Sequence, residues 1–247
     1  MRIDECVALV TGANRGLGAA FARMLLKRGA RRVYAGVRDP ATVTDAGVVP
    51  IRLDVTDPDQ VADAAERCAD VTLLINNAGV LADSPLLAAP SMEAGRAEME
   101  VNYFGTLSMC RAFAPVLRRN GGGAMVNVLS AASFFTNPAM GSYAASKAAA
   151  WALTNGARVE LRRQGTQVVA VHSGYIDTDM AARVTDTKAS PETVATTTLD
   201  ALEAGAEEVL ADERTRQIKT AVPTDLATIY PAIQQTWDRR TPSSGRS

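Results

Sequence analysis

A glycine-rich turn between an apolar run and a helical pattern is the strongest constraint on the fold of this 247-residue chain. Residues 7–10 read Val-Ala-Leu-Val, and residues 11–18 read Thr-Gly-Ala-Asn-Arg-Gly-Leu-Gly. Apolar residues recur at positions 17, 20, 21, 24 and 25, the spacing of one helix face. A strand–turn–helix unit brings free N–H groups at a helix N-terminus close to a phosphate, so the turn predicts dinucleotide binding. A glycine-rich turn can also be purely structural.

Seven short apolar runs alternate with helical patterns along the chain. They are rich in valine, isoleucine and leucine with little polar alternation, which is typical of parallel strands covered on both faces. The predicted strands are Val7–Val10, Arg32–Gly36, Val49–Leu53, Val71–Ile75, Ala124–Leu129, Gln167–Val171 and Glu207–Leu210. This rhythm predicts an α/β fold, a doubly wound Rossmann domain with a single seven-stranded parallel sheet and helices on both faces.

The domain is expected to span residues 1–240, and the polar segment 241–247 is expected to be a disordered tail. The polar segment Asp179–Ser190 interrupts the rhythm before a helix start at Pro191. This segment is either a lid over a site or a connecting loop.

Charge and composition exclude several classes of function. The chain has 26 basic and 27 acidic residues and a net charge of −1, which argues against nucleic-acid or anionic-membrane partners. Its start lacks the pattern of a signal peptide, and no apolar stretch is long enough for a membrane span, so a cytoplasmic protein is expected. Three widely spaced cysteines predict free thiols. The single histidine, His172, argues against a multi-histidine metal site and a Ser-His-Asp hydrolase, and we expect no metal.

The end of the second strand bears on the choice of dinucleotide. Sites for NAD usually carry an acidic residue there to hold the ribose hydroxyls. This chain has Gly36 near that place, followed by Arg38, while Arg15 adds a cation in the glycine turn. Two guanidinium groups suit a 2′-phosphate, so NADP(H) is predicted over NAD(H). The alternative is that both arginines are solvated surface residues and that Asp39 holds the ribose.

Tyr143 and Lys147 are the strongest candidates for chemistry. Four residues apart on a helix, they project from one face, and a fixed ammonium beside a phenol favours the phenolate and lowers its pKa. The spacing alone is common on solvated helix faces.

Together, the glycine turn and the Tyr143/Lys147 pair resemble the short-chain dehydrogenase/reductase family, and the chain looks like a carbonyl-reductase-like member. Further landmarks of the family stand in order: Asp54-Val55 after the third strand, Asn76-Asn77-Ala78-Gly79 after the fourth, Asn102, and Ser130 thirteen residues before Tyr143.

The resemblance implies reversible, NADPH-dependent reduction of a ketone or aldehyde to the alcohol. Tyr143 would donate the proton, and Ser130 would hydrogen-bond the carbonyl oxygen. Lys147 would lower the pKa of the phenol and bind the nicotinamide ribose, and Asn102 would position a water that relays protons. The cofactor-binding residues it implies are Gly12, Asn14, Arg15, Gly16, Leu17, Gly18, Arg38, Asp54, Val55, Asn77, Ala78, Gly79, Tyr143, Lys147, Gly174, Ile176 and Thr178. Ser173 replaces the family's usual proline, which leaves the conformation of the nicotinamide turn open.

The resemblance also indicates where substrate would bind. Phe134, Phe135 and Met140 lie between Ser130 and Tyr143, and Tyr175 and Met180 would form the opposite lip. These side chains predict an apolar pocket for a hydrophobic carbonyl compound. Core packing is the alternative for the two phenylalanines.

Two other functions stay open. A non-catalytic NADP-binding sensor would keep the fold without turnover. A sugar-nucleotide-modifying relative also carries Tyr-x-x-x-Lys, but it usually has a larger C-terminal substrate domain. Family members generally pair through the helices after Asn102 and Tyr143, so a homodimer or homotetramer is expected.

Overall fold

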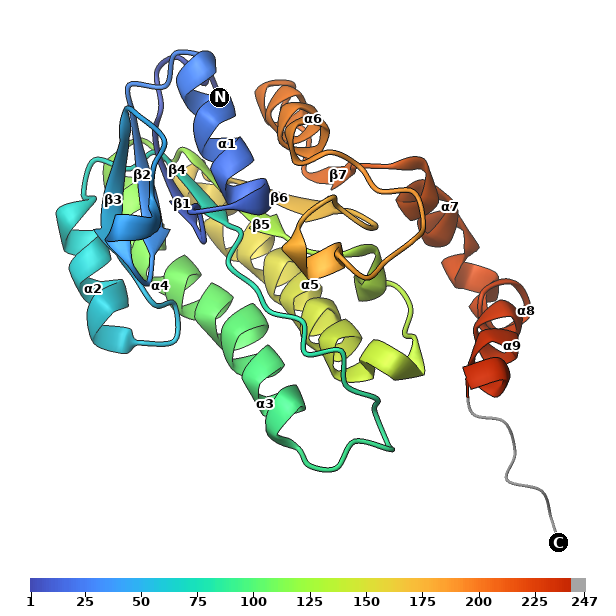
Figure 1. Ribbon diagram of the computed structural model, residues 1–247. Helices are drawn as coiled ribbons and strands as arrows, with labels where there is room; N and C mark the ends of the chain where they lie inside the picture. Colours follow the sequence, from blue (N-terminus) through green and yellow to red (C-terminus); the bar gives the residue numbers. More distant parts are fainter. Residues whose placement is uncertain (241–247) are drawn as a thin grey trace, which may run out of the picture.

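Each of the seven predicted apolar runs forms a strand in the computed structural model, which describes residues 1–240. The strands are β1 Val7–Thr11, β2 Arg32–Val37, β3 Val48–Arg52, β4 Leu73–Asn76, β5 Ala124–Val128, β6 Gln167–His172 and β7 Glu208–Leu210. They pair in parallel in the order β3-β2-β1-β4-β5-β6-β7 (Figure 1). The predicted seven-stranded Rossmann sheet is confirmed, and the predicted tail lies outside the described residues.

Side-chain hydrogen bonds mark several helix starts. Ser190 caps a helix that begins at Pro191, as predicted, because its hydroxyl accepts the Thr193 N–H at 3.0 Å. Asp57 and Asp212 cap two further helices in the same way. The helices are α1 Gly16–Lys27, α2 Pro58–Arg67, α3 Glu93–Met99, α4 Thr106–Arg119, α5 Gly141–Leu161, α6 Pro191–Glu203, α7 Glu213–Ala221, α8 Asp225–Thr228 and α9 Tyr230–Arg240.

Two apolar layers cover the sheet, one on each face. Along β1, Ala8 and Val10 join the layer that contains residues of α1 and α6. Val7 and Leu9 point the other way and join the layer that contains residues of α2 and α4. Every residue of β1 is buried, which explains why the strand reads as an unbroken apolar run.

The strand order reverses direction beside β1. From β1 the chain proceeds outward to β2 and β3, and it then returns to β4 on the other side of β1. In open sheets of this kind, ligands bind in the crevice beyond the carboxyl ends of the strands at that reversal. The turns after β1 and β4 therefore border the expected site.

A π-helical segment, Glu100–Gly105, joins α3 to α4 and carries Asn102. Such irregular turns often occur at functional sites. Helices α7, α8 and α9 lie at one edge of the molecule, beyond β7 (Figure 1). Within residues 1–240, no helix combines the length and apolar character needed to cross a membrane.

Candidate active site

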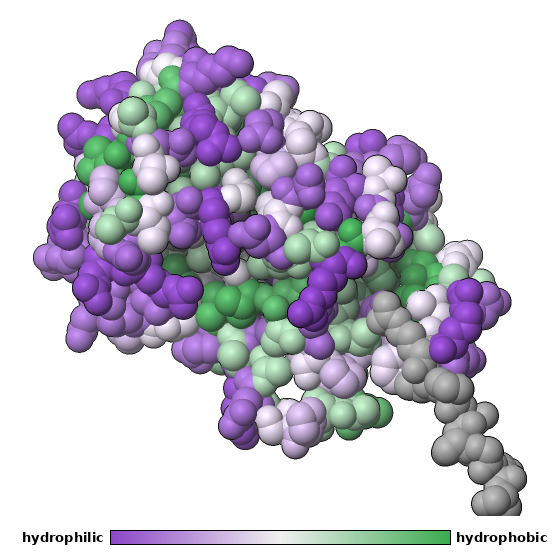
Figure 2. All heavy atoms as spheres, in the orientation of Figure 1, coloured by the Kyte–Doolittle hydropathy of each residue, from purple (hydrophilic) through white to green (hydrophobic). Residues whose placement is uncertain are grey.

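A cavity of about 1060 Å³ lies at the carboxyl edge of the sheet. All the residues that the sequence analysis expected to bind cofactor line it, from the glycine turn to Thr178. Ser130, Tyr143 and Lys147 line it as well, whereas Asn102 does not. Figure 2 shows hydrophobic atoms gathered across the middle of the face seen in Figure 1. One hollow therefore brings together the glycine turn and three of the four expected catalytic side chains.

The glycine turn has the backbone that a dinucleotide site requires. Gly12 and Gly16 have φ angles of 66° and 54°, a region that side chains disfavour. A Cβ atom at Gly18 would overlap the Gly12 carbonyl oxygen and would lie 2.6 Å from the Asn77 amide nitrogen. The turn is therefore held in a shape that leaves the first turn of α1 open to a phosphate.

Asn77 joins the turn after β4 to the turn after β1. Its side-chain amide donates to the carbonyl oxygens of Thr11, at 2.9 Å, and Gly12, at 3.3 Å. The Thr11 hydroxyl accepts the backbone N–H groups of Asn77 and Ala78 at 2.9 Å each. These bonds fix the two sides of the crevice relative to each other.

The end of β2 bears on the choice of dinucleotide, because Arg38 and Asp39 both line the cavity there. A Cβ atom at Gly36 would lie 2.6 Å from a methyl carbon of Leu53, so tight packing favours glycine here. Arg38 is exposed and lines the cavity. A carboxylate oxygen of Asp39 accepts the Ala41 N–H at 3.0 Å and caps a short helical turn. The side chain of Asp39 is thus partly committed to a local structural contact.

Arg15 and Asp179 line the cavity and form an ion pair with each other. The Arg15 guanidinium donates to the Asp179 carboxylate at 2.8 Å, and both side chains are exposed. Asp179 begins a short 3₁₀ turn, Asp179–Ala181, in the polar segment before α6. This ion pair connects the glycine turn with that segment.

Tyr143 and Lys147 lie on the first two turns of α5, and both are buried. The Lys147 ammonium lies 5.8 Å from the centre of the Tyr143 ring and donates to the Val128 carbonyl oxygen at 3.0 Å. Burial lowers the pKa of Lys147 to about 8. The ammonium is therefore still mostly protonated at neutral pH.

The expected lowering of the Tyr143 pKa is not what the structure shows. Burial raises the pKa of Tyr143 to about 12, because a phenolate is poorly solvated there, and a hydrogen bond with Ser130 offsets this only in part. At neutral pH the phenol of Tyr143 therefore carries its proton. That is the form a proton donor needs.

Ser130 follows β5 and faces the same cavity. Its hydroxyl accepts the Ala132 N–H at 3.1 Å, while the Ser133 hydroxyl accepts the Ser130 N–H at 3.4 Å. This pair of bonds begins the 3₁₀ turn Ala131–Ser133 and fixes the backbone of Ser130.

Asn102 is buried beside the site, and its side chain is fully engaged. Its amide nitrogen donates to the Val80 carbonyl oxygen and the Ser146 hydroxyl, each at 2.9 Å, and its amide oxygen accepts the Val80 N–H at 2.8 Å. The side chain therefore holds the segment after β4 against α5. The expected water relay stays a prediction.

Asp212, which the sequence analysis missed, anchors the nicotinamide turn. Its carboxylate accepts the Gly174 N–H at 2.6 Å and the Ser173 hydroxyl at 3.3 Å, and it caps α7 through Thr215. A hydroxyl at position 173 thus makes a contact that the family's proline could not make. An aspartate directly before a helical pattern was the available signal.

Phe134 does not line the cavity, which corrects the expected pocket. Its ring stacks on His172 at 4.3 Å and meets Trp151 edge-on at 4.9 Å. His172 is buried, and burial lowers its pKa to about 4, so it is neutral at pH 7. As a neutral ring, His172 can donate from Nδ1 to the Ser130 carbonyl oxygen, 3.1 Å away. The core packing of Phe134 thus supports the strand end that carries Ser130.

The other four expected pocket residues, Phe135, Met140, Tyr175 and Met180, do line the cavity. Arg183 also lines it. Residues 80–83, Arg214 and Ile218 line it too and were not foreseen as pocket walls. Arg214 lies 4.9 Å from the centre of the Tyr175 ring and forms an ion pair with Asp186 at 2.7 Å. The walls are mainly apolar, with cations near part of the rim.

The arrangement can be compared with known proteins. The family model "short chain dehydrogenase" matches residues 6–189. This chain belongs to the short-chain dehydrogenase family. A short-chain dehydrogenase from Burkholderia cenocepacia J2315, solved in complex with NADP, is 46% identical, with a TM-score of 0.87 over 98% of this chain and 100% of the other.

Curated relatives of this short-chain dehydrogenase agree with the assignment. Sorbitol dehydrogenase of Cereibacter sphaeroides is 35% identical over 187 residues, covering 72% of this chain and 73% of the relative. The 1-deoxy-11-beta-hydroxypentalenate dehydrogenase of Streptomyces exfoliatus is 34% identical over 224 residues, covering 82% and 81%. As a member of this family, the chain is an oxidoreductase of alcohol- or ketone-type substrates.

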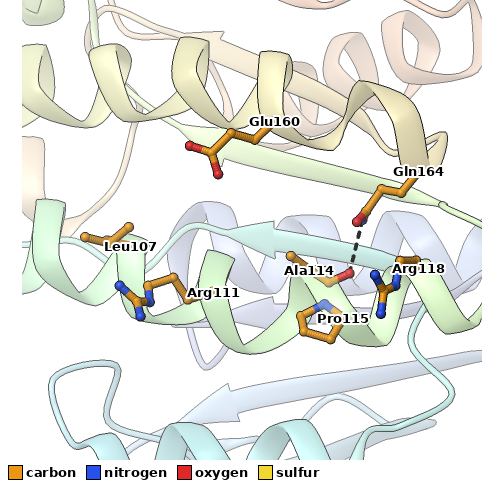
Figure 3. Close-up of a pocket in the computed structure, with 7 residues that line it drawn as sticks. All are labelled: Leu107, Arg111, Ala114, Pro115, Arg118, Glu160 and Gln164. Carbon is orange, nitrogen blue, oxygen red and sulfur yellow. Dashed lines mark hydrogen bonds between the residues drawn. The ribbon is translucent and has the colours of Figure 1, made fainter.

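A second cavity of this short-chain dehydrogenase, about 500 Å³, lies between α4 and the end of α5 (Figure 3). Gln164 donates across it to the Ala114 carbonyl oxygen at 3.1 Å. Arg111, Arg118 and Glu160 supply its charges, and none of the expected catalytic residues lines it.

Proposed function

We propose that this dehydrogenase reduces a hydrophobic ketone or aldehyde to the alcohol with NADPH, reversibly. The observation that carries the proposal is that Ser130, Tyr143 and Lys147 line the same cavity as the glycine turn. The residues fit a dinucleotide, because the glycines of the turn hold it in a shape that leaves the N-terminus of α1 open to a phosphate. When bound, NADPH supplies the hydride that reduces the carbonyl carbon.

Side chains of the protein stabilise and protonate the carbonyl oxygen of the substrate. Negative charge grows on the carbonyl oxygen as its carbon is reduced, and the Ser130 hydroxyl stabilises that charge by a hydrogen bond. The Tyr143 phenol, protonated at neutral pH, gives its proton to this oxygen and completes the alcohol. Lys147, anchored on Val128, keeps a positive charge beside the phenolate so formed and would hold the nicotinamide ribose. Asn102 would position the water that returns a proton.

The preference for NADP(H) over NAD(H) rests on charge at the end of β2. Arg38 and Arg15 both line the cavity, and tight packing against Leu53 disfavours an acidic side chain at position 36. A 2′-phosphate would bind the two guanidinium groups. The Burkholderia cenocepacia structure in complex with NADP supports this choice.

The apolar walls of the cavity support the proposed substrate class. Phe135, Met140, Tyr175 and Met180 present apolar surface beside Tyr143, which favours a hydrophobic carbonyl compound over a sugar. The relative named for a hydroxypentalenate supports an alcohol on a hydrophobic skeleton, while the sorbitol dehydrogenase shows that a polyol is a competing class.

The family's mode of pairing suggests a homodimer or homotetramer formed through α4 and α5. Ala145, Ala152 and Gly156 leave a small-residue, exposed surface on α5, and the cavity of Figure 3 places Arg111 and Glu160 beside it. The three cysteines are free and buried, which suits a reducing compartment such as the cytoplasm. Sedimentation equilibrium tests the pairing: a dimer or tetramer is expected, and a monomer at micromolar concentration would reject it.

The experiment that tests the function is a panel assay. Hydrophobic ketones and aldehydes and, separately, sugars and polyols are incubated with the protein and either NADPH or NADH. We expect cofactor consumption with a hydrophobic ketone and NADPH. Tight NADPH binding without turnover on any member of the panel would instead favour the sensor, and turnover of polyols alone would reject the substrate class.

A further inference from the structure

Glu98 is a buried carboxylate on α3, beside the catalytic helix. Its side chain is 1% exposed, and no lysine, arginine or histidine among residues 1–240 forms an ion pair with it. One carboxylate oxygen accepts the Ala82 N–H at 2.8 Å, and the other accepts the Ser142 hydroxyl at 2.5 Å. Burying a carboxylate without a cation costs free energy, so these two bonds must hold it in place.

The two groups that Glu98 joins belong to two different segments beside the active site. Ala82 lies in the segment after β4 and lines the cavity. Ser142 directly precedes Tyr143 in the first turn of α5. The carboxylate therefore ties one wall of the cavity to the turn that carries the proposed proton donor.

A second contact holds the same segment two residues earlier. Asn102, one helical turn beyond Glu98, bonds both backbone groups of Val80. Leu81, between the two fastened residues, packs against the buried cluster that contains Tyr143. The position of Leu81 against this cluster is thus set from both sides.

We propose that Glu98 is a positioning residue for the reductase site: through Ala82 and Ser142 it fastens the segment after β4 to the first turn of α5. The proposal rests on the proposed function for its consequence in turnover, but not for its structural part. Fixing this wall would set how a carbonyl group approaches the phenol.

The charge of Glu98 also affects the pKa of Tyr143. Three side chains on three elements act on the phenol: Glu98 on α3, Lys147 on α5, and Ser130 after β5. The negative charge of Glu98 adds to the effect of burial and raises the pKa of Tyr143, and the Ser130 hydrogen bond opposes both. Glu98 therefore helps to keep the phenol in its proton-donating form.

The test separates hydrogen bonding from charge. Glu98→Gln keeps the size of the side chain and can still accept the Ala82 N–H, but it removes the charge. Glu98→Leu removes both, Ser142→Ala removes one of the two bonds, and Glu100→Gln is the control at an exposed glutamate nearby. For each variant, hydrogen exchange of the peptide containing Ala82 and a tyrosinate absorbance titration, referenced to Tyr143→Phe, are measured on the whole protein.

We expect exchange at Ala82 to rise about tenfold or more in Glu98→Leu, because a hydrogen bond to a charged acceptor is lost. In Glu98→Gln, exchange should stay near wild type while the tyrosinate titration moves to lower pH by about half a unit or more. Ser142→Ala should loosen the segment less than Glu98→Leu, which keeps the test usable if the latter does not fold.

Wild-type exchange in both Glu98→Leu and Ser142→Ala would overturn the fastening role, and an unmoved titration in Glu98→Gln would overturn the charge effect. Neither readout needs a substrate. If no ketone is ever reduced, the proposed function fails while these two results still decide the role of Glu98. With an active ketone from the panel, Glu98→Leu should alter KM and kcat and leave NADPH affinity unchanged.

Discussion

The cofactor end and the substrate end of the cavity are built in different ways. At the cofactor end, backbone from two short segments, 11–18 and 77–79, forms the surface, and glycines make its shape. At the substrate end, side chains from separate parts of the chain meet, including residues 80–83, Tyr175 and Ile218. A single substitution that alters the backbone should therefore abolish cofactor binding at the first end. At the second end, turnover should fall in smaller steps as the side chains that hold the walls are replaced one by one.

The largest effect on cofactor binding is expected at Gly18. In Gly18→Ala, the new methyl group would overlap the Gly12 carbonyl oxygen, so the turn must open. We expect NADPH affinity, measured by fluorescence titration, to fall about 100-fold or more, with a loss of about 1–3 kcal/mol in the free energy of unfolding.

Gly156→Ala is the matched control, because nothing lies within 4 Å of a Cβ atom at that helical position. It should leave NADPH affinity unchanged. Wild-type affinity in Gly18→Ala would show that the cofactor end is not determined by backbone packing.

At the substrate end, His172 should make stability depend on pH. Its pKa is about 4 in the folded protein and 6.5 ordinarily, so the unfolded chain takes up a proton first as pH falls. Its contribution is complete above pH 6.5 and is lost as pH falls toward about 4, by up to about 3 kcal/mol. Urea denaturation across this range should show a shallower pH dependence in His172→Gln than in wild type. Parallel curves for the two proteins would exclude His172 as the source.

The choice between NADPH and NADH is an exception at the cofactor end, because we expect it to depend on the side chain of Arg38. In Arg38→Ala, the ratio of NADPH to NADH affinity should fall about 10- to 100-fold, the value of one charge-assisted contact. Arg23→Ala removes an arginine that pairs with Asp45 and Glu192 outside the cavity, and it should leave the ratio unchanged. An unaltered ratio in Arg38→Ala would reject this residue as the 2′-phosphate contact.

Asp212 should give the smallest effect, since it supports the nicotinamide turn from behind. Asp212→Ala removes the bonds to Gly174 and Ser173 and the cap of α7. We expect kcat to fall about tenfold, with about 1 kcal/mol lost in stability. Ser190→Ala removes the cap of α6 and should lose similar stability without the fall in kcat. Equal kcat in the two variants would show that Asp212 only caps α7 and does not support the nicotinamide turn.

The contrast between the two ends of the cavity also explains which features could be predicted from the sequence. All seven strands and the glycine turn were predicted because their signals are local: apolar runs, glycine spacing and a helix start within a few residues. Arg214 and Asp212 were missed because they reach the site only through the packing of α7.

Phe134 was placed wrongly for a related reason. From the sequence, an apolar side chain in the core cannot be told from one that lines a pocket. Only the stacking of Phe134 on His172 in the structure shows that this side chain belongs to the core. The pKa of Tyr143 was judged from its charged neighbour, whereas burial, which a sequence does not show, has the larger effect.

The most direct test of the account is a paired measurement on Tyr143→Phe, with Tyr34→Phe as a control whose hydroxyl bonds Asp70 away from the cavity. NADPH affinity and NADPH-dependent ketone reduction are measured on the same preparations. We expect wild-type NADPH affinity in both variants and a fall in kcat of about 1000-fold in Tyr143→Phe alone. Ketone reduction by Tyr143→Phe at the wild-type rate would contradict the proposed role of the phenol.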